Sequence, residues 1–256
     1  MAFNGQSWQG SRWFFPSLCG AAALLGVLTV LVKPAPAQAA ESATIAEILD
    51  GKELYVDKQQ AAVKQQATAP QIVSTQNSRG QLNFSGGAAG RLNRFSMLRL
   101  GSSCFLMEKG QILVSGKQNG CTRSARMSVR GTNYLIDVQD DGSSELSVLE
   151  GSVEVEPLRE GAPSGKPATT VAAGEKVKLS AEGVILTLLK LSTGDYNSIL
   201  RGPLFSGFSA ALPGFSALES YIRSAVPGVT LPSLPGVPSG IPSAPSLPSF
   251  PRFGLF

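Results

Sequence analysis

Short runs of alternating apolar and polar residues, separated by glycine turns, recur along most of the chain. Residues 127–156 show the pattern best, because Tyr134, Ile136 and Val138 occupy every second position before the turn-forming sequence Asp140-Asp141-Gly142. A period of two is typical of a half-buried β-strand, and glycine supplies the positive φ that a tight hairpin needs. Alternation then resumes on both sides of Gly151, and a glycine at such a point indicates a bulge or corner. The stretch therefore predicts three successive strands.

The same pattern predicts an all-β fold for residues 43–191, with strands about every 8–12 residues. We expect short antiparallel strands and hairpins stacked into a sandwich or a coiled β-architecture, with a barrel as an alternative. Hairpin turns are predicted at Asp50-Gly51, at residues 108–110 and at Asn119-Gly120. Residues 57–71, rich in Gln and Ala, are expected to form a short helix or a loop. About 150 residues are enough to bury a core.

The first 39 residues resemble a secretory signal peptide. Arg12 precedes an uncharged apolar run at residues 17–32, and Ala37-Gln38-Ala39 provides a small-x-small cleavage pattern. The apolar run is shorter than the roughly 20 residues of a spanning helix. We therefore expect cleavage and export to the periplasm or the medium, with an uncleaved anchor as the alternative. The residues before Cys19 make a poor lipoprotein site, so no lipid anchor is expected.

Charge gives no indication of a nucleic-acid partner. Removal of residues 1–39 takes away two positive charges, Arg12 and Lys33, and no acid, which lowers the formal net charge from +4 to +2. The remaining positive charges are dispersed, unlike those of basic nucleic-acid-binding arms. After residue 39 no apolar segment is long enough to predict a membrane span.

Two cysteines, Cys104 and Cys121, remain after the predicted signal peptide. An even number of cysteines in an exported protein favours a disulfide, and two reduced, buried thiols are the alternative. The bond is expected to join strands on either side of a strand at residues 112–114.

The C-terminal part differs in composition. Residues 192–226 are interpreted as a linker with a short amphipathic helix from Pro213 to Ala225, since Phe215, Leu218, Ile222 and Ala225 recur at helical spacing. This helix is expected to pack on the β domain, with binding of a partner as the alternative.

Residues 227–256 form a tail rich in Pro, Ser and Leu. Prolines recur every three residues with one inserted residue near Gly240, and polyproline II has three residues per turn. The tail is therefore expected to be extended, either as a spacer or as a docking strip for an aromatic groove. The apolar residues of such a strip are Leu231, Leu234, Val237, Ile241, Ala244, Leu247 and Phe250.

The residues available for chemistry are few. The chain contains no histidine, which excludes Ser-His and Cys-His nucleophile pairs and histidine-containing zinc sites. The glycines at 86–90 lack the spacing and the lysine of a phosphate loop. Four carboxylates, those of Asp137, Asp140, Asp141 and Glu145, do not follow the EF-hand spacing for calcium. A carboxylate-pair glycosidase stays open, but both tryptophans lie in the predicted signal peptide. We expect no enzyme activity, metal or cofactor.

Several motifs resemble the FecR domain. Arg130-Gly131-Thr132 leads into the strand at 134–138, and Leu149-Glu150-Gly151 separates two later strands. Residues 171–175, which include Gly174 and Glu175, resemble the "L-x-A-G-E" element of that family. The resemblance extends over about residues 43–180. In these motifs Gly131, Thr132, Glu150, Gly151, Gly174 and Glu175 are expected to be structural and not to form a binding site.

The resemblance implies an all-β extracytoplasmic domain similar to the periplasmic part of iron-uptake regulators, which receive a signal from an outer-membrane receptor and control a sigma factor. Our leading interpretation is a non-catalytic exported FecR-domain protein that serves as a binding or scaffold module in the bacterial cell envelope. Its partners would be envelope proteins or cell-wall components. The alternative is a sensor or regulator component linked to sigma-factor or iron-uptake signalling.

Overall fold

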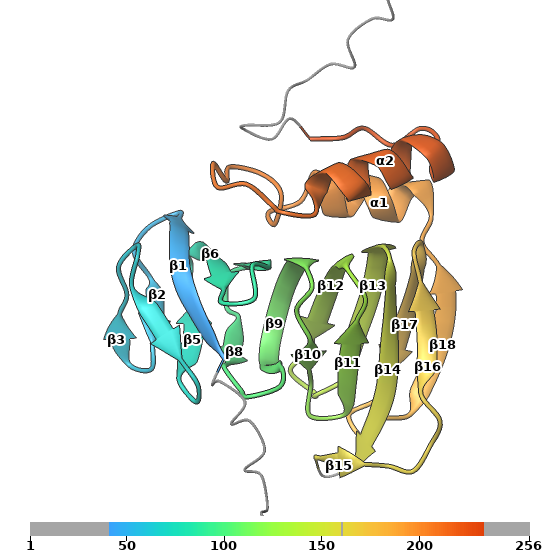
Figure 1. Cartoon of the computed structure of the whole chain (residues 1–256), viewed down its shortest axis with the longest axis horizontal. Coiled ribbons are helices and arrows are strands. Elements are labelled where there is room, and N and C mark those ends of the chain that lie inside the picture. The colour runs from blue at the N-terminus through green and yellow to red at the C-terminus, as the bar shows by residue number, and fades with distance from the viewer. Residues whose placement is uncertain (1–40, 160, 233–256) are drawn as a thin grey trace, which may run out of the picture. The chain divides into compact units, whose positions relative to one another are not determined.

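A computed structural model describes residues 41–159 and 161–232 (Figure 1). The chain is all-β in this part, apart from two short helices near its end, as predicted. The strands are β1 (Ser42–Leu49), β2 (Leu54–Val56), β3 (Gln59–Gln60), β4 (Gln66–Thr68), β5 (Ile72–Thr75), β6 (Arg79–Phe84), β7 (Ala89–Leu92), β8 (Met97–Arg99), β9 (Phe105–Gly116), β10 (Gly120–Cys121), β11 (Ala125–Val129), β12 (Thr132–Val138), β13 (Ser144–Glu150), β14 (Ser152–Arg159), β15 (Ala162–Pro163), β16 (Thr169–Ala172), β17 (Glu175–Leu179) and β18 (Ile185–Lys190). The helices are α1 (Thr193–Leu200) and α2 (Phe215–Ala225).

All the strands except β15, which pairs only with the end of β14, form two sheets that enclose a common core. Sheet A has the order β4-β1-β6-β7-β9-β12-β13-β17-β18, and all its neighbours are antiparallel. Sheet B has the order β3-β2-β5-β8-β9-β10-β11-β14-β16, in which only the β9–β10 pair is parallel. Alternate side chains of both sheets, such as Leu82, Ile136 and Val155, are fully buried between them. This architecture is a sandwich with coiled connections, one of the predicted alternatives.

Strand β9 belongs to both sheets. Its first residues pair with β8 and β10 in sheet B, and its residues from Gly110 onward pair with β7 and β12 in sheet A. Gly110 has a φ of +78°, and a Cβ at this position would lie 2.9 Å from the carbonyl oxygen of Phe95. Among the described strands, every other pairing joins β1–β8 with one another or β10–β18 with one another. Strand β9 therefore divides the sandwich into two halves.

The hairpins predicted around the opening stretch are correct, and several others are wrong. The turn at residues 140–142 joins the paired strands β12 and β13, and Gly151 marks the corner where the chain leaves sheet A for sheet B. In contrast, residues 108–110 lie inside the continuous strand β9. The turn at Asp50-Gly51 leads from sheet A to sheet B, and Gly120 of the predicted Asn119-Gly120 turn is itself the first residue of β10, which runs parallel to β9. The connections at residues 50–51 and 119–120 join strands of different sheets or parallel neighbours. Turn-forming residues occur in such connections as well as in hairpins, so they do not show which kind of connection is present.

The helix considered for residues 57–71 is also absent, because this segment contains the short strands β3 and β4. The predicted C-terminal helix is present as α2. Phe215, Leu218 and Ile222 of its predicted apolar face are buried, whereas Ala225, at the last turn, is exposed. Helix α1 was not predicted. It begins with a capping box in which the Ser192 hydroxyl accepts a hydrogen bond from Asp195 N, while the Asp195 carboxylate accepts one from Ser192 N.

Candidate functional site: the seat of the C-terminal cap

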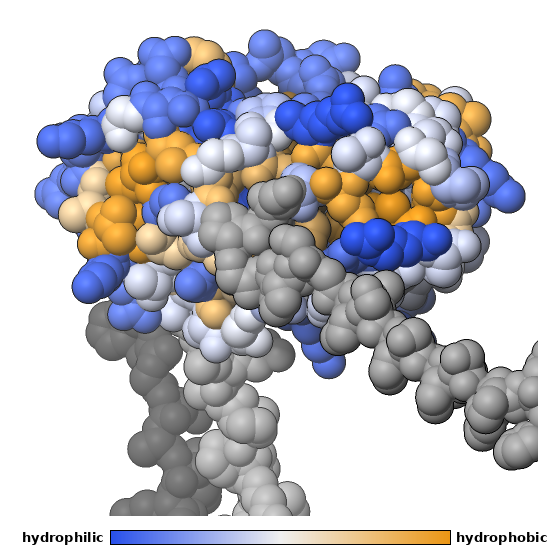
Figure 2. Space-filling view, turned by 90° about the horizontal axis from the view of Figure 1, so that it is seen from above, coloured by the Kyte–Doolittle hydropathy of each residue, from blue (hydrophilic) through white to orange (hydrophobic). Residues whose placement is uncertain are grey.

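Residues 191–231, which we call the cap, cover the face of sheet A that points away from the sandwich core. Leu113, Leu135 and Leu149 project from this face, because they alternate with residues of the sandwich core. Together with apolar side chains of the cap, these leucines form a second hydrophobic core. The cap residues of this core include Leu191, Tyr196, Leu200, Leu204, Phe205, Leu212, Phe215, Leu218 and Ile222. On the side that carries the helices, Figure 2 shows apolar residues in two areas bordered by hydrophilic ones. We call the cap-contacting surface of sheet A the seat.

The seat binds the cap through polar groups as well. Asn133 on β12 is 1% exposed, and its Nδ2 donates hydrogen bonds to Glu150 Oε2 (2.9 Å) and to the carbonyl oxygen of Gly214 (2.9 Å). The backbone N–H of Gly214 donates to Ser115 Oγ on β9 (2.9 Å). A Cβ at residue 214 would lie 3.0 Å from both side chains, so the start of α2 approaches the sheet closely.

Two cap tyrosines lie over the turn between β16 and β17. The hydroxyl of Tyr196 donates a hydrogen bond to the carbonyl oxygen of Leu149 (3.0 Å). A Cβ at Gly174 would lie 2.9 Å from Tyr221 Oη and 3.6 Å from Tyr196 Oη. Burial, followed by the neighbouring Tyr221, raises the pKa of Tyr196, which keeps this hydroxyl protonated. Gly174 thus leaves room for the tyrosines that attach the helices.

The most unusual residue of the seat is Arg91 on β7, whose side chain is fully buried. Its Nε donates to Gln81 Oε1 (2.8 Å), while Nη1 and Nη2 donate to the carbonyl oxygens of Leu204 (3.1 Å) and Ala210 (2.8 Å). The guanidinium carbon lies 4.3 Å from the ring centroid of Phe208, in cation–π geometry. Burial lowers the pKa of Arg91 to about 10, so the group stays charged at neutral pH.

A second arginine, Arg79 on β6, binds the same loop of the cap. Its Nη1 donates to the carbonyl oxygens of Pro203 and Ser206, the latter at 2.8 Å, and its guanidinium carbon lies 5.5 Å from the Phe208 ring. The rest of the guanidinium group forms an ion pair with Asp50, at 2.6 Å and 3.1 Å. Two cations of the β domain therefore bind backbone carbonyls of residues 203–210.

Glu47 on β1 binds the same loop with the opposite charge. Its carboxylate accepts hydrogen bonds from the backbone N–H groups of Ser209 and Ala210 (3.0 and 2.9 Å) and from Ser209 Oγ (2.8 Å). Burial raises the pKa of this carboxyl, but the hydrogen bonds and the charge of Arg91 outweigh it, and the net pKa lies below the ordinary 4.5. Carbonyl oxygens and N–H groups of the loop thus both have charged partners on the seat.

The lowered pKa of Glu47 predicts how pH acts on the loop. A carboxyl whose pKa is lower in the folded state stabilises the fold above its unfolded pKa, and this contribution is lost as pH falls through the folded value. Amide NMR signals of Ser209 and Ala210 should therefore shift on acidification with a midpoint below pH 4.5. In Glu47→Gln the same two signals should be shifted at neutral pH and show no such titration. Glu219→Gln, on the exposed side of α2, is the control, and unchanged Ser209 and Ala210 signals in Glu47→Gln would contradict the prediction.

Four of the predicted motif residues meet at one corner of the domain. Gly131 has a φ of +57°, Thr132 is buried at the start of β12, and Gly151 has a φ of +83°. A Cβ at Gly151 would lie 2.4 Å from Thr132 Cγ2 and 2.7 Å from the carbonyl oxygen of Gly131. Glu150, the fourth, accepts the hydrogen bond from Asn133 that also orients this amide toward the cap.

The remaining two motif residues lie at the turn beneath the tyrosines. Gly174 has a φ of +79°, and its carbonyl oxygen accepts a hydrogen bond from Leu191 N (2.7 Å) at the start of the cap. Glu175 begins β17 and accepts a hydrogen bond from Ala172 N (2.9 Å). Both the corner and this turn thus contact the cap, although sequence reasoning did not connect the motif residues with it.

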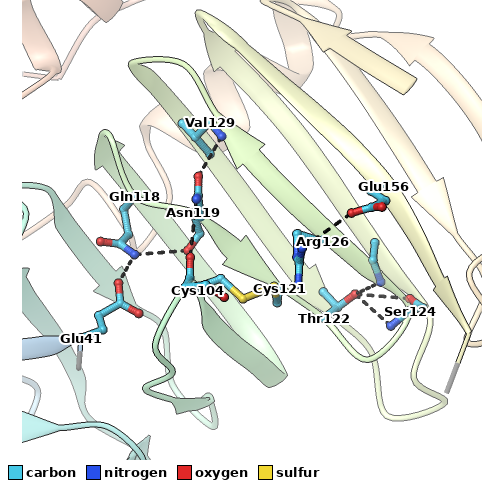
Figure 3. The surroundings of a disulfide bond; sticks show 12 residues. Glu41, Cys104, Gln118, Asn119, Cys121, Thr122, Ser124, Arg126, Val129 and Glu156 are labelled. Carbon is cyan, nitrogen blue, oxygen red and sulfur yellow. Dashed lines mark hydrogen bonds and ion pairs between the residues drawn. A yellow bond between two sulfur atoms is a disulfide. The ribbon is translucent and has the colours of Figure 1, made fainter. Parts of the chain in front are cut away.

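The predicted disulfide joins Cys104 and Cys121, with 5.9 Å between their Cα atoms (Figure 3). Cys104 directly precedes β9 and Cys121 lies on β10, its parallel neighbour, so the bond does not flank the 112–114 segment as expected. Close by, Gln118 Nε2 donates to Glu41 Oε1, and the other oxygen of Glu41 is buried without a hydrogen-bond partner among the described residues. Burial raises the pKa of Glu41.

Loss of the disulfide should destabilise the domain by about 3 kcal/mol, the chain-entropy value for a loop of this length. The double variant Cys104→Ala/Cys121→Ala should unfold at lower urea concentration than the wild type. Reductant should lower the midpoint of the wild type and leave that of the variant unchanged. Equal midpoints for the wild type and the variant under oxidising conditions would contradict this expectation.

Most of the predicted docking strip lies outside the described residues, since Leu234, Val237, Ile241, Ala244, Leu247 and Phe250 all follow residue 232. Leu231 is described, and it packs against the core of the cap. The predicted signal peptide, residues 1–39, also lies outside the described residues. Among residues 41–159 and 161–232, no helix is long and apolar enough to cross a membrane.

The four carboxylates considered for calcium have separate protein partners. Asp137 accepts a hydrogen bond from Gln111 (2.7 Å), Asp140 pairs with Lys109 (2.7 Å), Asp141 accepts from Ser143 N (2.8 Å) and Glu145 faces Lys178 (3.7 Å). Burial raises the pKa of Asp137 despite its hydrogen bond from Gln111. Within the described part of the chain, no group of three or more His, Cys, Asp or Glu residues could hold a metal ion.

Sequence reasoning missed the polar residues of the seat, above all Glu47, Arg79, Gln81 and Arg91. Arg79 and Gln81 occupy alternate positions of β6, and a charged residue within a predicted strand is an available signal for a covered polar face. The direction of that face was not predictable, because it depends on which sheet each strand joins.

The fold is thus an antiparallel β sandwich whose outer face is covered by a C-terminal helical segment. Residues 71–154 match the family described as FecR protein, and the chain therefore carries a FecR domain there, as its motifs predicted. Arg79 and Arg91 lie within the match, whereas Gly174 and the cap follow it.

Comparison with solved structures gives two crystal structures of a candidate anti-sigma factor from Parabacteroides distasonis. One is 18% identical with a TM-score of 0.41, and the alignment covers 51% of this chain and 65% of that protein. The other is 17% identical with a TM-score of 0.40, and covers 59% of this chain and 73% of that one. Comparison with curated protein sequences gives no significant match.

Proposed function

We propose that the chain is a non-catalytic regulatory component of the bacterial cell envelope, linked to sigma-factor signalling through its FecR domain. The observation that carries this proposal is the FecR match over residues 71–154. The family resemblance of the motifs implies an extracytoplasmic domain that passes a signal by protein contact. In this proposal residues 1–39 direct export and an envelope protein is the partner.

The cap gives this proposal a structural element that a partner can act on. Its loop of residues 203–210 is bound through backbone carbonyls and N–H groups by three charged residues of the seat, Arg79, Arg91 and Glu47. Such contacts depend on the backbone of the bound segment, so a segment of another protein with the same turn conformation could use them in the same way. We propose that regulation involves exchange of this loop between the seat and a partner.

The test is a transcription reporter in the native host. Deletion of the gene should change the expression of a reporter for a sigma-factor-dependent promoter, and the full-length chain should restore it. A chain with Asp50→Asn and Glu47→Gln, which weakens the seat, should restore it only in part. A chain without residues 1–39 should fail to restore it, since the protein would not be exported.

The scaffold interpretation makes a different prediction for the same strains. If the chain only holds envelope components together, deletion should leave the transcript levels of all sigma-dependent promoters unchanged while the recovery of envelope partners after cross-linking falls. That result would reject the regulatory proposal. Fractionation of tagged cells provides the location, and a cytoplasmic signal for the wild-type chain would contradict both interpretations.

A further inference from the structure

The last strand of sheet A, β18, has an open edge. Among the described strands it pairs only with β17, and Figure 1 shows it at the margin of the β strands. Its apolar side chains are unusually exposed, at 58% for Leu186, 45% for Leu188 and 52% for Leu189, and Val184 just before it is 43% exposed. Natural proteins usually protect such edges with charges, prolines, β-bulges or a covering element, and of these β18 has a bulge at Leu186. An apolar edge of this kind is typical of an interaction surface.

The sandwich core is incomplete at this edge. Leu188 is paired with Val177 on β17, and the two side chains lie on the same face of the sheet. Val177 is fully buried between the sheets, whereas Leu188 is nearly half exposed. In sheet B the last strand is β16, which pairs with β14 and has no further neighbour among the described residues. Additional strands beside this edge would therefore cover Leu188 and extend the core.

The charges at the two ends of this edge are complementary. Glu182 lies in the turn before β18, and Lys190 is the last residue of the strand. Both side chains are exposed, and neither forms an ion pair with another described residue. Between them, residues 183–189 carry no charge. The edge thus has an acid at its start, a base at its end and apolar side chains in between.

We infer that β18 is a dimerisation edge, which pairs antiparallel with β18 of a second copy of this chain. In such a pairing the start of one strand meets the end of the other. A register centred on Leu186 brings the turn that carries Glu182 of one copy near Lys190 of the other, where the two side chains can form an ion pair, and the two-fold symmetry repeats this pair. The same contact buries the exposed leucines and joins the two copies of sheet A into one continuous sheet. This inference rests on the edge alone and does not depend on the proposed function.

The ion pair allows a test by charge exchange. Sedimentation velocity of the purified chain, over a range of concentrations at low salt, should show a reversible monomer–dimer equilibrium. Glu182→Lys and Lys190→Glu should each weaken dimerisation at least tenfold, because each homodimer then contains two like-charge contacts. The double variant, with both charges exchanged, should dimerise like the wild type. Lys52→Glu, in an exposed turn on the other half of the domain, is the control and should leave the dimer unchanged.

An equimolar mixture of the two single variants provides the decisive result. Every Glu182→Lys chain presents two lysines and every Lys190→Glu chain two glutamates, so the mixed dimer has two attractive contacts. The mixture should therefore dimerise at concentrations at which neither variant does so alone. A wild-type chain that stays monomeric, single variants that dimerise normally, or a mixture that stays monomeric would each overturn the proposal. Thermal melts of the variants separate loss of the interface from loss of the fold.

Discussion

Replacement of Arg91 by methionine should lower the free energy of unfolding by about 3–5 kcal/mol. Methionine has nearly the length of arginine but donates no hydrogen bonds, so the side chain of Gln81 and the carbonyl oxygens of Leu204 and Ala210 would lose their donor inside the protein. For a chain of this size the corresponding decrease in Tm is roughly 6–20 °C. Urea unfolding followed by circular dichroism measures the change.

Two further variants separate the role of hydrogen bonding from that of charge. Arg91→Lys keeps the charge but cannot reproduce the planar set of donors, so its stability should lie between those of Arg91→Met and the wild type. Arg126→Met removes an exposed arginine whose ion pair with Glu156 measures 3.9 Å, and should change stability by less than about 0.5 kcal/mol. An Arg91→Met protein within about 1 kcal/mol of the wild type would show that the loop is not held through this residue.

The second large effect is expected at Gly151. An alanine there needs a φ near +83° and places its Cβ 2.4 Å from Thr132 Cγ2 and 2.7 Å from the carbonyl oxygen of Gly131. The positive φ costs about 1 kcal/mol, and the close Cβ contacts force the backbone of the corner to move. We therefore expect the free energy of unfolding to fall by about 3–4 kcal/mol in total. Thermal and urea unfolding of Gly151→Ala measure it.

Gly131 is the matched control, because it belongs to the same corner and also has a positive φ, of +57°, but no neighbouring atom lies within 4 Å of the place a Cβ would take. Gly131→Ala should therefore cost only about 1 kcal/mol, the conformational part. Equal losses for the two variants would show that conformational strain alone, and not the close contact with Thr132, explains the glycine at position 151.

The parts of the fold that were predicted correctly are those specified by a local sequence pattern alone, without information about which distant strands pair. The alternation at residues 134–138 and the turn at 140–142 specify a hairpin by themselves, and α2 is specified by the spacing of Phe215, Leu218 and Ile222. The hairpins predicted at residues 50–51 and 119–120 are wrong, since a glycine turn gives a change of direction but does not determine which sheet the next strand joins.

The candidate site was less predictable than the fold. The contacts of Arg79, Arg91 and Glu47 with the cap connect residues more than 110 positions apart in the chain. The bound groups of the loop are backbone carbonyls and N–H groups. Almost every residue type carries them, so the amino-acid sequence of the loop does not indicate these contacts. The motif residues Glu150 and Gly174 were recognised from the sequence, but their contacts with Asn133 and with the cap tyrosines became apparent only in the structure.

The position of β9 has a consequence for the order in which the protein can acquire its structure. Strands β1–β8 and β10–β18 pair across the molecule only through β9, yet the cap contacts both groups, with Glu47 and Arg91 in the first and Asn133 in the second. The cap follows all the strands in chain order. Each half can thus form around β9 as the chain emerges, but the cap contacts that connect the two halves can form only after residues 203–214 have emerged.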